Sequence, residues 1–222
     1  MKKEIKPIAY IQNDFTSKFG IPRQSGLSNL LSTIVFEKEF SDSSALKGIE
    51  GFSHLWLIWG FSQNEEEKKF SPTVRPPRLG GNKRVGVFAS RSPFRPNGLG
   101  LSSVCLKEVK KGALVVEGAD LMNGTPIYDI KPYLPSSDCH TDAIGGFADA
   151  HNDYKLMVNF PTELLNLIAV EKQNGLLECL SDDPRPSYID DEDRVYGMKY
   201  ADYNVKFTVS EKILTVIEIE NL

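Results

Sequence analysis

The chain has 222 residues, of which 41% are hydrophobic and 25% charged. This length allows one large domain or a medium domain with a small companion, and the composition excludes collagen-like, low-complexity and disordered proteins. The longest apolar run, at residues 55–61, is far shorter than the roughly 20 residues that cross a bilayer, so no transmembrane helix is expected. The first residues lack the apolar stretch of a secretory signal, and we expect a cytoplasmic protein.

The formal net charge of −4 hides a strongly basic segment. Residues 68–100 contain eight lysines and arginines and no acidic residue, whereas residues 151–222 carry a net charge of −7. Concentrated positive charge on an otherwise acidic chain favours a polyanionic or phosphate-bearing partner. The alternative is a solvated loop whose arginines pair with carboxylates elsewhere in the chain.

Residues 1–135 are predicted to be mostly β-strand. Short β-branched or aromatic runs, bounded by Gly, Pro, Asn or Ser, occur at 8–11, 33–36, 55–61, 85–88 and 113–116. The turn Lys110-Lys111-Gly112 is typical of a hairpin between antiparallel strands. This spacing predicts a barrel or a sandwich. Its long connections, at 12–30 and 62–84, are of a length that is commonly functional.

A small, polar linker at 136–153 leads to a second unit, predicted as a small α+β domain. Thr162 is expected to cap its first helix, and Asn174-Gly175 to interrupt it. Asp183-Pro184-Arg185-Pro186 predicts a fixed, extended loop. The elements expected in this unit are helices at 163–168 and 176–180 and strands at 203–209 and 213–219.

The pattern of histidines and cysteines predicts no metal site. Cys105, Cys139 and Cys179 are widely spaced and are expected to be reduced thiols. His54, before the most apolar run, is expected to be a buried, hydrogen-bonded histidine rather than a catalytic one. The fingerprints of serine hydrolases, P-loop proteins and Rossmann dinucleotide sites are absent from the sequence.

Three loops combine prolines or glycines with residues that suit ligand binding. Residues 19–27 contain Arg23, residues 87–101 contain Arg91 and Arg95, and residues 118–133 contain an Asn-Gly-Thr-Pro turn. Arginines on a restricted backbone suit bidentate recognition of a carboxylate or phosphate. The Asn-Gly-Thr-Pro segment could be a tight turn and nothing more, but three such loops in one domain favour a binding site.

These motifs together resemble the TrmO family, also called TsaA-like or YaeB-like. The resemblance is carried by residues 21–24, 51–56, 75–81, 86–97, 123–126 with 129–133, and 183–188. It spans both expected units, in the family's order. It implies a mainly β protein, with an N-terminal β-barrel methyltransferase domain over 1–140 that is not a Rossmann fold and a small α+β C-terminal domain over 151–222.

The resemblance further implies a homodimeric, S-adenosylmethionine-dependent tRNA methyltransferase. Its reaction is methylation of N6 of threonylcarbamoyladenosine at position 37, next to the anticodon. Many relatives have aspartate at the position of Asn123 and histidine near Ser62. The implied cofactor-binding residues are Pro22, Arg23, Gln24, Ser62, Gln63, Arg91, Leu101, Asn123, Gly124, Thr125 and Pro126.

Methyl transfer from a sulfonium requires alignment and exclusion of water more than a strong base. Asp129 and Tyr128 are the candidates for accepting the N6 proton, and a structural role is the alternative for each. Two other functions stay open: a non-catalytic RNA-binding barrel, and a methyltransferase of this fold with another acceptor. The residues expected to contact the anticodon stem-loop are Lys68, Lys69, Arg75, Arg78, Lys83, Arg84, Arg95 and Arg185.

Overall fold

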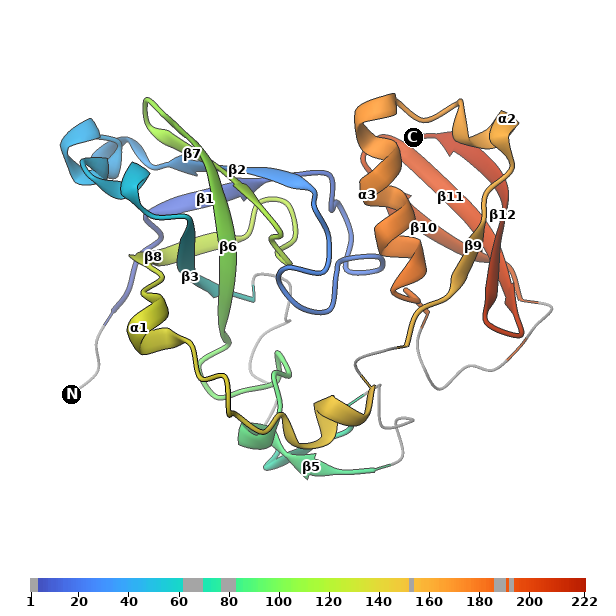
Figure 1. The fold of residues 1–222 in the computed structure, drawn as a ribbon, viewed down its shortest axis with the longest axis horizontal. Helices are drawn as coiled ribbons and strands as arrows, with labels where there is room; N and C mark the ends of the chain where they lie inside the picture. The colour runs from blue at the N-terminus through green and yellow to red at the C-terminus, as the bar shows by residue number, and fades with distance from the viewer. Residues whose placement is uncertain (1–3, 62–69, 77–82, 152–153, 186–190, 192–193) are drawn as a thin grey trace.

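The computed structural model describes residues 4–61, 70–76, 83–151, 154–185, 191 and 194–222. Figure 1 shows two β-structures side by side, a barrel built from the blue-to-green strands and a C-terminal sheet, in orange and red, with a helix against it. Among the described residues, no helix is long and apolar enough to span a membrane.

The N-terminal part is a closed barrel with the strand order β1-β2-β7-β6-β3-β8. Neighbouring strands are antiparallel throughout. The mainly β fold with an N-terminal barrel is therefore confirmed, and the sandwich alternative is excluded. The strands are β1 (Ala9–Gln12), β2 (Leu31–Phe36), β3 (His54–Gly60), β6 (Leu99–Lys110), β7 (Ala113–Glu117) and β8 (Pro126–Pro132).

Alternating side chains from these strands fill the barrel, as period-two burial requires. Trp59, which is 7% exposed, closes one end of this core. It pairs with Gly100 across β3 and β6, and its ring lies so close that a Cβ atom on Gly100 would stand 2.2 Å from Cε2. The other buried residues of the barrel core include Ile11, Ile34, Leu55, Leu57, Val104, Leu114, Val116 and Ile127.

The strand directions bring three connections to the same end of the barrel. Strands β1, β3 and β7 end there and β2, β6 and β8 begin there, so residues 13–30, 61–98 and 118–125 emerge together. We call this the loop end. The longest of the three, residues 61–98, is called the middle connection and includes β4 (Thr73–Val74) and β5 (Val85–Gly86). The strand expected at 85–88 stops at Gly86, because Val87 is buried in a 3₁₀ turn that reaches Ala89.

The opposite end carries the other connections of the barrel. The hairpin turn Lys111-Gly112 forms there as expected, with Gly112 at φ +69°. Between β2 and β3 lie 3₁₀ turns at Lys38–Phe40, Ser43–Leu46 and Ile49–Gly51. Beyond β8 the chain forms α1 (Pro135–Asp138) and a 3₁₀ segment (Gly146–His151) inside the expected linker.

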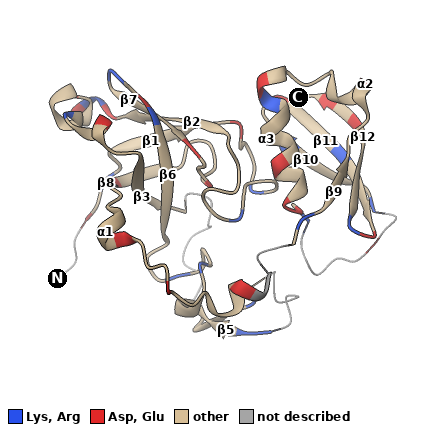
Figure 2. Cartoon of the chain, viewed as in Figure 1, with Lys and Arg blue, Asp and Glu red and all other residues tan. Residues whose placement is uncertain are grey.

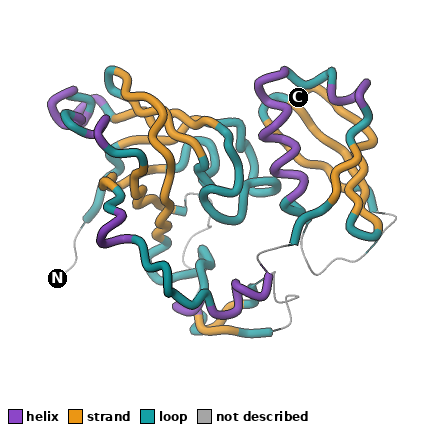
Figure 3. The backbone as a smooth tube through the Cα atoms, in the orientation of Figure 1, coloured by secondary structure: helices purple, strands orange, loops and turns teal. Residues whose placement is uncertain are grey.

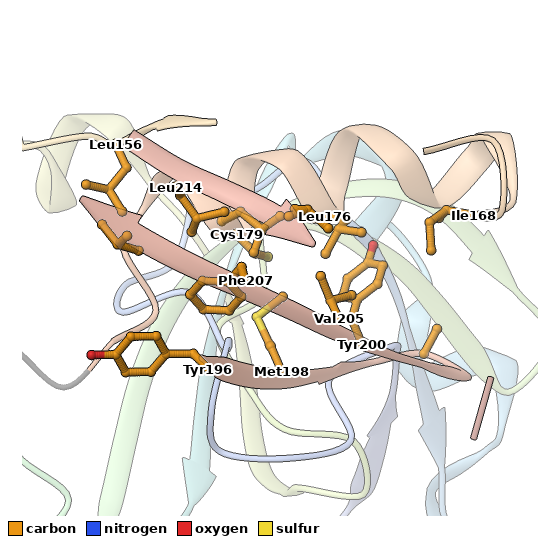
Figure 4. Packing of buried hydrophobic residues seen from close by; sticks show 14 of the residues in the cluster. Leu156, Ile168, Leu176, Cys179, Tyr196, Met198, Tyr200, Val205, Phe207 and Leu214 are labelled. Carbon is orange, nitrogen blue, oxygen red and sulfur yellow. The ribbon is translucent and has the colours of Figure 1, made fainter. Parts of the chain in front are cut away.

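The C-terminal part is a four-stranded sheet of order β10-β11-β12-β9. Figure 4 shows Leu176 and Cys179 of α3 facing Val205 and Phe207 of β11. Burial raises the pKa of the Cys179 thiol to about 12, and all three cysteines are free. The elements are β9 (Met157–Asn159), α2 (Thr162–Leu165), α3 (Val170–Ser181), β10 (Tyr196–Tyr200), β11 (Tyr203–Ser210) and β12 (Ile213–Asn221).

The helix α3 runs through Asn174-Gly175, so the expected interruption was wrong. Gly175 is a contact residue: a Cβ atom there would stand 2.2 Å from Cδ2 of Leu30, which belongs to the connection 13–30. Glycine inside a helix costs about 1 kcal/mol relative to alanine. The close approach of Leu30 explains why this cost is accepted here.

The connection 13–30 packs on the C-terminal domain. Its Phe15, Phe19, Ile21 and Leu30 all contact the core of that domain, and the loop reaches across toward α3 (Figure 3). Gly20 has φ +96°, and a Cβ atom there would stand 2.3 Å from Sδ of Met198, so the backbone itself lies against β10. The two parts of the chain therefore share one hydrophobic core at this loop.

Replacing Gly100 by alanine should destabilise the barrel by about 1 to 3 kcal/mol, because the new methyl group would overlap the Trp59 ring. Urea unfolding followed by tryptophan fluorescence measures this. Gly86→Ala is the matched control, because nothing lies within 4 Å of a Cβ atom at that position. Equal stability of the two variants would contradict the packing described for Trp59.

Candidate functional site

A glutamine and an arginine meet at the loop end. Nη1 of Arg91, in the connection 61–98, donates to Oε1 of Gln24, in the connection 13–30, at 2.5 Å. Arg91 is exposed, whereas Arg95 donates to the carbonyl of Ser90 at 2.9 Å and fixes the turn between them. Gln24 and Arg91, which are both expected to bind the cofactor, are thus brought together, although they lie 67 residues apart in the chain.

A hydrogen-bonded chain lies beneath this pair. Nε1 of Trp59 donates to Oγ of Ser102 at 2.9 Å, and Oγ of Ser102 donates to Oδ1 of Asp120 at 2.5 Å. Two residues before Asp120, the carbonyl of Gly118 accepts from the amide of Gly26 at 2.8 Å. These hydrogen bonds join β6, the connection 13–30 and the connection 118–125.

The surroundings of Asp120 shift the pKa of its carboxyl in opposite directions. Burial raises the pKa of this carboxyl above 3.8, and this is the largest influence. The hydrogen bond from Ser102, the backbone amides and the positive charge of Arg91 act to lower the pKa. The residue was missed by sequence reasoning. Its signal was a lone carboxylate directly after the buried strand β7, inside a motif that was already singled out.

Hydrogen bonds at the turn around Asn123 link the connection 118–125 to the connection 13–30. Oδ1 of Asn123 accepts from the amide of Asn13 at 3.1 Å, and the Asn123 amide donates to the carbonyl of Phe15 at 2.8 Å. The Gly124 amide is likewise bonded to the carbonyl of Ile11 at 2.8 Å. Thr125 is buried and Pro126 begins β8. A ligand contact by these four residues stays a prediction.

The other residues expected at the cofactor have side chains engaged elsewhere or lie outside the described residues. Nη2 of Arg23 donates to the backbone carbonyls of Asp183 at 2.6 Å and Arg185 at 3.2 Å, so Arg23 connects to the C-terminal domain. Pro22, next to it, is buried. Leu101, 55% exposed, lies on the outer face of β6. Ser62 and Gln63 lie outside the described residues.

The outer face around Leu101 contains a cavity of about 360 Å³. Trp56 and Ile58 of β3 share its lining with Leu101, and so do residues of α1 and the segment after it. A second surface cavity, of about 820 Å³, is lined by residues 6, 7, 10 and 37–40, away from the loop end. Neither cavity is lined by Gln24 or Arg91.

The two candidates for proton transfer differ in position. Tyr128 lies against Gly60 at the end of β3, where a Cβ atom would stand 2.7 Å from the Tyr128 hydroxyl. Asp129 pairs with Lys131 at 2.8 Å on the exposed surface of β8. Tyr128 therefore adjoins the loop end, and Asp129 is engaged in a surface ion pair. Their catalytic roles stay predictions.

Three basic residues of the middle connection that were expected to bind RNA are exposed. Arg75, Lys83 and Arg84 are exposed, and Figure 2 shows blue, the colour of Lys and Arg, on the ribbon beside β5. Arg185 differs, because it is 13% exposed and pairs with Asp183 at 2.9 Å; the structure gives no support for an RNA contact there. Lys68, Lys69 and Arg78 lie outside the described residues.

His54 was expected to be buried but is exposed. Its Nδ1 lies 2.9 Å from Oγ of Ser53, and its ring centroid lies 6.2 Å from that of Tyr133. The strand β3 begins at His54, with the buried positions starting at Leu55. Within the described part of the chain, no group of three or more His, Cys, Asp or Glu side chains is arranged to hold a metal ion.

Comparison with known proteins assigns the family. Residues 10–139 match the profile of the tRNA-methyltransferase O N-terminal domain, and residues 153–222 match the TrmO C-terminal domain. A solved structure of TrmO from Pseudomonas aeruginosa superposes with a TM-score of 0.79 at 31% identity, and covers 100% of both chains. Another TrmO crystal structure gives a TM-score of 0.81 at 30% identity, with the same coverage. The chain belongs to the TrmO family.

Two relatives are similar over nearly the whole chain. The tRNA (adenine(37)-N6)-methyltransferase of Escherichia coli K12 is 38% identical over 230 residues, which cover 98% of this chain and 97% of the relative. A protein of P. aeruginosa, described as the putative S-adenosylmethionine-dependent methyltransferase RcsF, is 41% identical over 214 residues and 92% of each chain.

The pH dependence of stability should report on Asp120. The pKa of Asp120 is raised in the folded protein. Between pH 3.8 and this raised pKa, the folded state therefore keeps a proton on Asp120, whereas the unfolded chain has already lost it. The unfolding free energy of the wild type, relative to Asp120→Asn, should therefore fall as pH rises through this window and level off above it. Urea unfolding at a series of pH values measures it; a relative stability that increases with pH would contradict the burial of this carboxylate.

Proposed function

We propose that this protein is an S-adenosylmethionine-dependent tRNA methyltransferase that modifies N6 of adenosine 37. The observation that carries the proposal is the meeting of Gln24 and Arg91 at the loop end, within a chain of the TrmO family. Support comes from the E. coli relative, which is named for this activity, and from the P. aeruginosa relative, described as dependent on this cofactor.

The residues at the loop end fit such a cofactor in their chemistry. The exposed guanidinium of Arg91 suits a carboxylate. The Gln24 amide and the carbonyls of the turn 123–125 suit hydroxyl and amino groups. When bound, the cofactor would supply a methyl group on a positively charged sulfur. An amine nitrogen can attack this methyl carbon as the neutral thioether leaves, without metal assistance. The chain's part is to hold the two reactants in line and to exclude water.

The rigid backbone of the loop end suits this positioning role. The hydrogen bond from Arg91 to Gln24 fixes two connections relative to each other, and the hydrogen bond from Asn13 to Asn123 fixes the third. The N6 amine loses a proton when it is methylated. Tyr128, whose hydroxyl adjoins Gly60, is the better placed of the two candidates to receive it, because Asp129 is paired with Lys131.

The middle connection is the proposed tRNA-binding surface. Arg75, Lys83 and Arg84 supply positive charge for phosphates. Phe88 is 73% exposed and Phe94 is 55% exposed on the same connection. Exposed aromatic rings beside cations suit unpaired RNA bases, which stack on aromatic side chains in sequence-specific RNA recognition. An anticodon loop offers both phosphates and unstacked bases.

We further propose that the acceptor is threonylcarbamoyladenosine and that the protein acts in the cytoplasm as a homodimer. The dimer would cover the exposed apolar face at Ile58 and Leu101 and would allow Leu101, on the outer barrel face, to contribute to a site built from another subunit's loops. Light scattering should return twice the chain mass of 24.8 kDa, and a monomer at micromolar concentration would contradict the dimer.

The acceptor is tested by mass spectrometry of tRNA digests. Purified protein incubated with adenosylmethionine and tRNA that carries threonylcarbamoyladenosine should add one methyl group to that nucleoside. The same tRNA lacking the threonylcarbamoyl group is the control. Methylation of the unmodified adenosine alone would indicate another acceptor, and no methylation of either RNA, with binding retained, would indicate a non-catalytic RNA-binding barrel.

Arg91→Ala should weaken adenosylmethionine binding by about 1 to 3 kcal/mol, because a charge-assisted hydrogen bond is lost. Isothermal calorimetry in the presence of EDTA measures this and should show wild-type binding without metal. Arg84→Ala is the matched control, because Arg84 is an exposed arginine of the same connection that bonds to Thr73. Equal affinities of Arg91→Ala and the wild type would remove Arg91 from the site.

Reversing the charges of Arg75 and Lys83 to glutamate should weaken tRNA binding and flatten its salt dependence. The logarithmic slope should decrease by about 0.7 to 0.9 for each phosphate contact removed. Cofactor affinity should not change. The control reverses Lys47 and Lys111, two exposed lysines at the opposite end of the barrel. An equal loss in the control would show that the whole surface, rather than the middle connection, attracts RNA.

A further inference from the structure

A turn of the C-terminal domain receives the side chain of Arg23, the residue next to Gln24. Nη2 of Arg23 donates to the backbone carbonyls of Asp183 and Arg185, at 2.6 Å and 3.2 Å. Both acceptors are main-chain atoms, so this contact depends on the conformation of the turn. We call residues 183–185 the Asp-Pro-Arg turn.

The Asp-Pro-Arg turn is fixed by its own ion pair. Nε and Nη2 of Arg185 donate to Oδ1 and Oδ2 of Asp183 at 2.9 Å and 3.0 Å, and the Tyr154 hydroxyl donates to Oδ2 of Asp183 at 3.1 Å. The side chains of the pair are 13% and 11% exposed. Asp183 has φ +54°, in the left-handed region, which aspartate tolerates because its short polar side chain can bond locally.

Stability alone does not explain the Asp-Pro-Arg turn. A largely buried ion pair contributes little net stability, because the removal of two charges from water offsets their attraction. A left-handed backbone adds a further cost at any residue other than glycine. What the turn provides is two backbone carbonyls that one nitrogen of the Arg23 guanidinium bridges. Two costly features at one turn therefore indicate a role in holding Arg23.

The segment that begins at this contact, residues 23–29, is also held in its middle and at its end. The carboxylate of Glu178 in α3 accepts from the Asn29 amide at 2.6 Å and from Nδ2 of the same residue at 2.7 Å. Between the two ends, the Gly26 amide donates to the carbonyl of Gly118, just after β7, at 2.8 Å. The segment is therefore bonded to both domains, with its two ends on the C-terminal domain.

We propose that the Asp-Pro-Arg turn is a positioning element of the cofactor site and acts through Arg23. The turn fixes the Arg23 guanidinium, and with it the backbone that presents Gln24 to Arg91 and to the ligand. Arg23 then need not touch the ligand, and Arg185 serves to shape the turn. This inference rests on the proposed function, because it assumes that the Gln24–Arg91 pair binds adenosylmethionine.

Calorimetry with adenosylmethionine on the full chain, without RNA, tests the proposal. Arg185→Ala should weaken binding by about fivefold, comparable to the loss of one hydrogen bond, whereas a residue that only contacts RNA would leave this affinity unchanged. The double variant Arg23→Ala/Arg185→Ala should bind no more weakly than Arg23→Ala alone. Arg194→Ala is the matched control and should bind normally, because it removes an exposed arginine of the same domain, which lies over the Tyr196 ring.

Hydrogen exchange measured by mass spectrometry supplies a readout that does not depend on the cofactor. The amides of Gly26 and Asn29 are hydrogen-bonded, so the segment 23–29 should exchange slowly in the wild type. Arg23→Ala and Arg185→Ala should each speed this exchange several-fold, because the segment loses its first anchor. Strand β6 should keep its wild-type rates, which distinguishes local release of the segment from a general loss of stability.

A milder variant is used if Arg185→Ala fails to fold. Asp183→Asn keeps the shape of the side chain and its tolerance for a left-handed backbone. Its amide forms no ion pair with Arg185, and one of its two polar atoms donates instead of accepting. It should produce the same changes in affinity and exchange, smaller in size.

The outcomes separate this inference from the proposed function. A wild type that binds no adenosylmethionine would overturn both. A wild type that binds it, with Arg185→Ala unchanged in affinity or in exchange of the segment, would overturn only the role of the turn. Losses for Arg23→Ala and Arg185→Ala that multiply in the double variant would also overturn it, because Arg23 would then act on the ligand independently of the turn.

Discussion

The connection between β1 and β2 is held from two sides, and the loop end depends on it. Its apolar side chains, including Phe15 and Phe19, are packed into the core of the C-terminal domain. On the barrel side, the amide of Gly26 donates to the carbonyl of Gly118 at 2.8 Å. A loop of this length would lose much conformational entropy if it were ordered by the barrel alone. The C-terminal domain supplies the buried contacts that offset this loss.

This arrangement gives the C-terminal domain a physical role in the proposed site. Arg23 donates to the carbonyls of Asp183 and Arg185, and Glu178 of α3 accepts from the Asn29 amide at 2.6 Å. Both contacts flank the segment that carries Gln24. The domain thus acts as a support for the loop, and Arg23, which is expected at the cofactor, contributes to that support.

The filled barrel explains why the proposed site lies at its end. Six strands enclose only enough space for side chains, and Trp59 closes the interior against Gly100. A ligand cannot then enter the interior, and the proposed site is at the mouth, where Ser102 and Asp120 connect the interior to the loops. The rigidity needed for methyl transfer is provided by the packed interior, and the recognition groups are provided by the connections.

The sequence predicts most of the local structure and part of the site. Alternating apolar residues indicate the barrel strands, and the proline-rich and glycine-rich motifs indicate which loops matter. The hydrogen-bond partner of Asp120 is Ser102, which is distant in the chain and lies in another strand, so no local pattern identifies this contact. Gly175 was misjudged for the same reason, because Leu30 is its contact. By contrast, β10 has alternating burial that the sequence pattern could have indicated.

The central claim is that the three connections at the loop end form the cofactor site. A crystal structure of the complex with S-adenosylhomocysteine, the product of the proposed reaction, tests it most directly. The account predicts ligand density in contact with Gln24 and Arg91, beside the turn at 122–125. Density confined to the outer cavity lined by Trp56 and Leu101, with no ligand at the loop end, would contradict it.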